Sequence, residues 1–108
     1  MKIDFSKHGV VVAESYEIAS WYFNEILSEV SEHIVSKSST MIKFDEGGSL
    51  SILSANSLHH QRKDYAMVGL GTPDDILFNL VLPMVRKSEN IFFYVFEGEE
   101  YNYDKKQN

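Results

Sequence analysis

The sequence contains one short segment that could support metal or acid–base chemistry. His59 and His60 are adjacent and precede Gln61-Arg62-Lys63 in an expected loop. Adjacent residues cannot easily direct two imidazoles at one ion, and no third ligand follows at helical spacing. The segment is also too small a basic cluster for a nucleic-acid surface. A solvated polar loop is therefore favoured over a metal or general-base site.

Two other patterns are compared with known site chemistry. Gly69-Leu70-Gly71-Thr72 stands between an expected strand and an expected helix, as a phosphate-binding loop would, but its spacing matches neither phosphate-loop fingerprint. Asp74 and Asp75 follow at the helix start, where they would repel a phosphate. The carboxylate pairs fall in turns or at a helix start, with nothing to place them in one cleft. The sequence predicts no catalytic residue, metal ligand or cofactor.

The amino-acid composition indicates the charge of the expected binding partner. The 108 residues include sixteen acidic and ten basic side chains, for a net charge of -6, and no cysteine. Disulfides, thiolate metal sites and cysteine nucleophiles are thereby excluded. The negative charge disfavours nucleic acid and anionic membranes and favours a basic protein. No signal peptide or membrane-spanning apolar stretch is recognised, so we expect a cytoplasmic chain with a single domain over residues 1–108.

Hydrophobic periodicity and turn residues predict the elements that position any site. The expected elements are a strand at 1–6, a helix at 14–36, a hairpin of 41–45 and 49–54, a strand at 64–70, a helix that Thr72 caps and Pro83 weakens, a central strand at 90–97 and a last short strand. Short turns between neighbouring strands favour antiparallel pairing. We therefore predict an α+β fold with a mainly antiparallel sheet of five to six strands and two helices packed on it.

The helix expected at 14–36 carries an unusual face. An apolar stripe should pack on the sheet, and the opposite arc holds glutamates with no Lys or Arg. Ile18 and Trp21 fall inside that acidic arc. A tryptophan among carboxylates is typical of a binding hot spot for a basic protein. The alternative is that a loop or the second helix covers Trp21. The candidate residues on this helix are Glu14, Glu17, Ile18, Trp21 and Glu25.

The C-terminal segment has a similar composition. Glu97, Glu99 and Glu100 are interleaved with Tyr101 and Tyr103. Tyrosine beside acidic residues suits an interface that presents apolar area and hydrogen bonds together. The alternative is an edge strand whose charges prevent aggregation.

Together these features resemble the small, acidic, cysteine-free immunity proteins of bacterial contact-dependent growth inhibition and related polymorphic toxin systems. The resemblance is carried by size, charge and the two acidic-aromatic groups of residues, not by a motif. It implies a stoichiometric cytoplasmic toxin inhibitor that acts by protein–protein interaction. Its partner would be a basic toxin domain, typically a nuclease, whose active site the acidic-aromatic surface occludes.

Two further hypotheses stay open. A small-molecule-binding or enzymatic α+β domain would place a pocket between sheet and helices, with Tyr65, Tyr94, His59 and His60 as candidates. Self-association is the other, because the second helix is apolar over most of its circumference. Its apolar residues are Ile76, Leu77, Phe78, Leu80, Val81, Leu82, Met84 and Val85.

Overall fold

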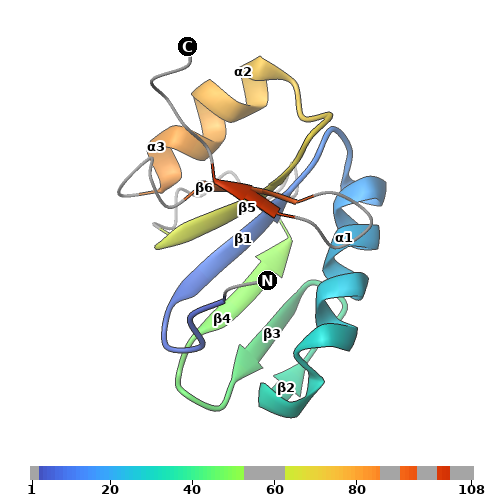
Figure 1. Cartoon of the computed structure of the whole chain (residues 1–108), viewed down its shortest axis with the longest axis vertical. Helices are drawn as coiled ribbons and strands as arrows, with labels where there is room; N and C mark the ends of the chain where they lie inside the picture. The colour runs from blue at the N-terminus through green and yellow to red at the C-terminus, as the bar shows by residue number, and fades with distance from the viewer. Residues whose placement is uncertain (1–2, 53–62, 86–90, 95–99, 103–108) are drawn as a thin grey trace.

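The computed structural model describes residues 3–52, 63–85, 91–94 and 100–102. They form one sheet in the strand order β2-β3-β4-β1-β5-β6-β7, with helices on both faces (Figure 1). In chain order the elements are β1 (His8–Val12), α1 (Tyr16–Glu29), the 3₁₀ turn η1 (Ser31–His33), β2 (Ile34–Lys37), β3 (Met41–Phe44), β4 (Ser49–Ile52), β5 (Tyr65–Gly69), α2 (Asp74–Ile76), the π-helical turn η2 (Leu77–Val81), α3 (Leu82–Met84), β6 (Ile91–Tyr94) and β7 (Glu100–Asn102).

The sheet is mixed, which corrects the mainly antiparallel arrangement that the short turns predict. β1 pairs in parallel with β4 and β5, and β5 pairs in parallel with β6. The pairs β2/β3, β3/β4 and β6/β7 are antiparallel. Parallel neighbours need a long crossover, which the helical segments after β1 and β5 provide. The predicted α+β class with two helical segments is confirmed. Strands β1 to β5 form the larger part of the sheet, and β6 and β7 extend it.

Two hydrophobic layers flank the sheet. On one face, Ala19, Phe23 and Ile26 of α1 pack against strand residues that include Val11 and Leu50. The α2–α3 segment forms the other layer, with residues from both helix and strands: Val10, Val12, Ala66, Val68, Leu77, Val81 and Val85. The alternating side chains of β1 therefore reach both layers.

The first strand lies later than the sequence predicts. Residues 1–6 are the expected strand, but β1 is His8–Val12, and Val10 to Val12 are fully buried. A short, continuous apolar run is typical of a strand buried on both faces, whereas alternation indicates one covered face. Ile3 and Phe5 instead pack against the α1 side of the core from outside the sheet.

Helix α1 begins where a side-chain cap forms and ends earlier than predicted. The Ser15 hydroxyl accepts a hydrogen bond from the Ile18 N–H at 3.2 Å, which satisfies one exposed donor of the first turn. The helix ends at Glu29 instead of residue 36. Beyond η1 the chain becomes β2, which pairs with β3. The β-branched residues Ile34 and Val35 suit a strand, and this pairing overrides the helical periodicity.

The second helical segment differs in detail from its expected form. Thr72 does not cap it; the Thr72 hydroxyl donates to the Gly69 carbonyl at 2.7 Å, and Pro73 is the N-cap. The π-helical turn η2 precedes α3, which contains Pro83. Pro83 has no amide hydrogen to donate within the helix, and the π turn next to it accommodates this missing hydrogen bond. Most of the apolar residues here pack on the sheet, while Phe78 stays exposed.

The remaining elements follow the sequence closely. The hairpin is formed by β3 and β4, with Gly47 in the turn at φ 95°. β5 and β6 lie within the strands expected at 64–70 and 90–97, and residues 95–97 lie outside the described part. The expected central position of the 90–97 strand is wrong, because β6 is next to the last strand in the sheet order and β1 occupies the middle. No helix in the described part of the chain combines the length and the apolar character that a bilayer crossing requires.

We predict that Gly48→Ala destabilises the fold. A Cβ at Gly48 would collide with the backbone carbonyl oxygens of Lys7 and Phe5, and the Gly48 N–H donates to the Phe5 carbonyl at 2.7 Å. Because backbone atoms cannot move aside cheaply, the free energy of unfolding should fall by about 1–3 kcal/mol in urea denaturation. The control is Gly71→Ala, whose Cβ would meet its nearest atom at 3.5 Å. Equal stability of the two variants would contradict the prediction.

Candidate functional site

The outward side of α1 presents large apolar side chains among carboxylates. Trp21 retains 54% exposure and Tyr16 retains 47%, although the buried side of the same helix is part of the core. Glu17 is exposed and Glu25 is half-buried. Residues four apart lie on one side of a helix, so Glu17, Trp21 and Glu25 occupy successive turns of one stripe. We call these three residues the acidic-aromatic stripe.

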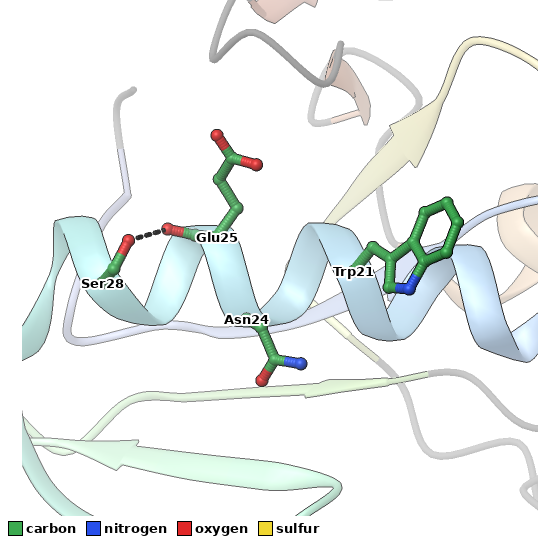
Figure 2. Close-up of a pocket in the computed structure, with 4 residues that line it drawn as sticks. All are labelled: Trp21, Asn24, Glu25 and Ser28. Atoms are coloured by element: carbon green, nitrogen blue, oxygen red, sulfur yellow. Dashed lines mark hydrogen bonds between the residues drawn. The ribbon is translucent and has the colours of Figure 1, made fainter.

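A shallow hollow lies beside Trp21. It is an open depression of about 520 Å³, lined by Trp21, Asn24, Glu25 and Ser28. Figure 2 shows the Glu25 carboxylate and the Asn24 amide extending to opposite sides of the helix, with the indole one turn before them. The Ser28 hydroxyl donates to the Glu25 carbonyl at 2.7 Å. The hollow therefore presents a carboxylate, an amide and an indole on one rigid helix.

The charges of α1 are not arranged for stability. The helix carries Glu17, Glu25 and Glu29, and its last turn has no basic residue. Glu17 is in the first turn, where a carboxylate interacts favourably with the positive helix end, but Glu25 and Glu29 lie toward the negative end. Each unfavourable placement costs about 0.3–1 kcal/mol at a surface site. Within the described part of the chain, none of the three forms an ion pair.

The other α1 candidates from the sequence lie apart from the stripe. Ile18 is half-buried and packs against the core, so it does not stand exposed beside Trp21. Glu14 is exposed but precedes α1, near Gly71 after β5. The second helical segment does not cover Trp21, because it packs on the opposite face of the sheet (Figure 1). The exposed indole thus fits the binding hypothesis better than the covered alternative.

The C-terminal candidates are described only in part. Glu97, Glu99 and Tyr103 lie outside the described residues. Glu100 and Tyr101 belong to β7, where they pair with Tyr94 and Phe93 of β6. β7 is the last strand in the sheet order, as the edge-strand alternative expects. Whether these residues join an interface stays a prediction.

The small-molecule hypothesis is not supported by the hollow beside Trp21, and only one of its candidate side chains is described. His59 and His60 lie outside them, as does the side chain of Tyr94. Tyr65 is buried in the core, where its ring occupies the space above Gly9 that a Cβ would need. The hollow described above opens on the outer side of α1 instead of between sheet and helix.

One cluster was not recognised from the sequence. His33 stacks on Phe5 with ring centroids 3.9 Å apart, and its Nδ1 lies 3.3 Å from a carboxylate oxygen of Asp45. His33, Asp45 and Glu46 are the described residues that could together hold a metal ion, with potential ligand atoms within 4.8 Å of one another. Twelve positions separate His33 from Asp45, and only the β2–β3 pairing unites them. No spacing pattern could have revealed the cluster.

The hydroxyl of Tyr65 is buried and has no hydrogen-bond partner among the described residues. Its pKa is raised above the ordinary value, first because burial disfavours the phenolate and then because Asp4 and Asp64 repel it. The ionised form that nucleophilic or basic chemistry needs is suppressed.

No protein-family model matches the chain, and comparisons with curated proteins and with solved structures give no significant match.

We predict that Tyr65→Phe reduces the loss of stability at alkaline pH. Above the ordinary tyrosine pKa of about 10, the phenol ionises in the unfolded chain while the folded chain keeps it neutral. Stability contributed by this group is therefore complete below pH ~10 and lost as the pH rises further. At neutral pH the free energy of unfolding of the variant should equal that of the parent or exceed it by up to ~1 kcal/mol. The reason is that the substitution removes a buried hydroxyl that has no partner among the described residues.

The measurement is urea denaturation at a series of pH values from neutrality to the alkaline limit of folding. The control is Tyr16→Phe, which removes an exposed hydroxyl from α1. If both variants lose stability with pH as steeply as the parent, the Tyr65 environment does not cause alkaline sensitivity.

Proposed function

We propose that this protein is a cytoplasmic immunity protein that binds a cognate basic toxin domain, of the nuclease class, and neutralises it by occluding its active site. The observation that carries the proposal is the exposed Trp21 among glutamates that no described residue neutralises. The protein acts by stoichiometric binding and needs no catalytic group or cofactor of its own.

The physical basis lies in the field of a nuclease cleft. Such a cleft is positive because it holds phosphates, and carboxylates on a rigid helix present a matching negative surface. Long-range attraction raises the encounter rate and selects a basic partner. A tryptophan at the centre of the contact then slows dissociation through buried apolar area. Glu17 and Glu25 supply the first effect and Trp21 supplies the second.

The composition of α1 supports a role in binding. Glutamates toward the negative end of a helix lower its stability, and a large exposed indole gains nothing by contact with water. Both features become favourable when a cationic surface covers them. The stripe faces away from the core, so such a partner could reach it without disturbing the fold.

The proposal predicts that the gene directly upstream encodes a large secreted toxin with a basic C-terminal domain, and that domain is the binding partner to test. A one-to-one complex should form, weaken as salt is added and block the toxin's cleavage of nucleic acid. Failure to bind that domain at low salt, with both proteins folded, would refute the proposal.

Charge reversal in the stripe should slow association. We predict that Glu17→Lys/Glu25→Lys lowers the association rate about tenfold or more at low salt, and that the difference shrinks at high salt. Stopped-flow or surface-plasmon measurements give the rate. The matched control is Asp74→Lys/Asp75→Lys, which changes the net charge equally on the α2 side of the sheet. Equal slowing by both pairs would assign the effect to overall charge and contradict a role for the stripe.

Removal of the Trp21 indole should change the dissociation rate instead of the association rate. We predict that Trp21→Ala raises the dissociation rate about 30-fold, which corresponds to a loss of about 2 kcal/mol, with little change in association. Tyr16→Ala, an exposed aromatic at the start of the same helix, is the comparison. A Trp21 variant that dissociates as slowly as the parent would place the contact elsewhere.

A further inference from the structure

The hollow beside Trp21 is rich in hydrogen-bond acceptors, and none of the described residues that line it is cationic. Glu25 offers a carboxylate and Asn24 offers an amide oxygen. The Ser28 hydroxyl has already donated its proton to the Glu25 carbonyl, so its oxygen is left as an acceptor. The occupant of such a site must supply several donors and a positive charge.

The indole adds a second requirement. A flat cation can lie against an aromatic ring, where the ring quadrupole attracts it, and an arginine guanidinium does so more readily than a lysine ammonium. The guanidinium also carries five donors in one plane, which suits the two oxygens of the Glu25 carboxylate. A purely apolar occupant would cover the Glu25 carboxylate without pairing it, which is costly.

The length of the site matches a long side chain. Trp21 and Ser28 are seven residues apart, which is about 10 Å along a helix. An extended arginine can therefore place its methylene groups and its guanidinium between the indole and Glu25. Figure 2 shows that the Asn24 and Glu25 side chains stand on the two sides of this path.

We propose that the hollow formed by Trp21, Asn24, Glu25 and Ser28 is the binding site for one arginine side chain of the basic partner. This inference rests on the proposed function and deepens it, because it names the chemical group that the acidic-aromatic stripe selects. Glu25 pairs with the guanidinium, and Trp21 packs against its plane.

Trp21 is the only tryptophan of the chain, so indole fluorescence reports from within the hollow. The probe is the tripeptide Gly-Arg-Gly, whose termini are blocked so that arginine carries its only charge. It is titrated at constant ionic strength. Its comparisons replace arginine with lysine, with glycine, or with citrulline, which keeps the shape and loses the charge. We expect a saturable change with a dissociation constant on the order of millimolar for arginine. Lysine should bind about threefold more weakly, and glycine and citrulline should give no saturable change.

Paired variants locate the binding. Glu25→Gln should weaken binding of the arginine peptide about threefold, as expected for an ion pair at the protein surface. Glu29→Gln removes the same charge one turn further along α1, outside the hollow, and should leave binding unchanged. Thermal melting confirms that both variants are folded.

Two results would overturn the proposal. One is equal response to the arginine and citrulline peptides, and the other is equal weakening by Glu25→Gln and Glu29→Gln. Binding of the upstream toxin domain is measured separately. If the complex depends on Trp21 but the hollow shows no preference for arginine, the proposed function stands and the arginine-binding site is rejected.

Discussion

β1 is hydrogen-bonded to a strand on each side and covered by a helical layer on each face. Val11 points to the α1 layer, while Val10 and Val12 point to the α2–α3 layer, so one short strand joins the two halves of the core. Removing water from both sides of such a strand requires that every backbone group pair within the sheet. The parallel partners β4 and β5 meet that requirement, and the positions of both helices follow from it.

This arrangement separates stability from surface chemistry. α1 is held through Ala19, Phe23 and Ile26, which are buried against the sheet. Its outer side is consequently free to carry side chains that would be poor choices for stability alone. Burial of a large apolar side chain contributes roughly 1.5–3 kcal/mol, which exceeds the cost of an unfavourably placed surface carboxylate. The fold can therefore tolerate glutamates in the acidic-aromatic stripe that no described residue pairs with.

Local signals in the sequence predicted much of this structure. Turn residues marked the β3–β4 hairpin, and helical periodicity separated the buried side of α1 from the side that holds Trp21 and Glu25. The predictions were wrong where an element is determined by residues that lie far away in the sequence. The end of α1 is set by the pairing of β2 with β3, and the parallel neighbours of β1 come from crossovers that periodicity does not encode. The His33 cluster was invisible for the same reason, since hairpin geometry brings its members together.

The sheet order also leaves β2 with one unpaired side. This strand has four residues, Val35 is 65% exposed, and its register with β3 shifts between Ile34 and Ser36. Such a shift bends the backbone and interrupts the regular ladder of donors and acceptors that another chain would need as a template. The recruitment of an extended segment from a neighbouring molecule is consequently discouraged at this end of the sheet.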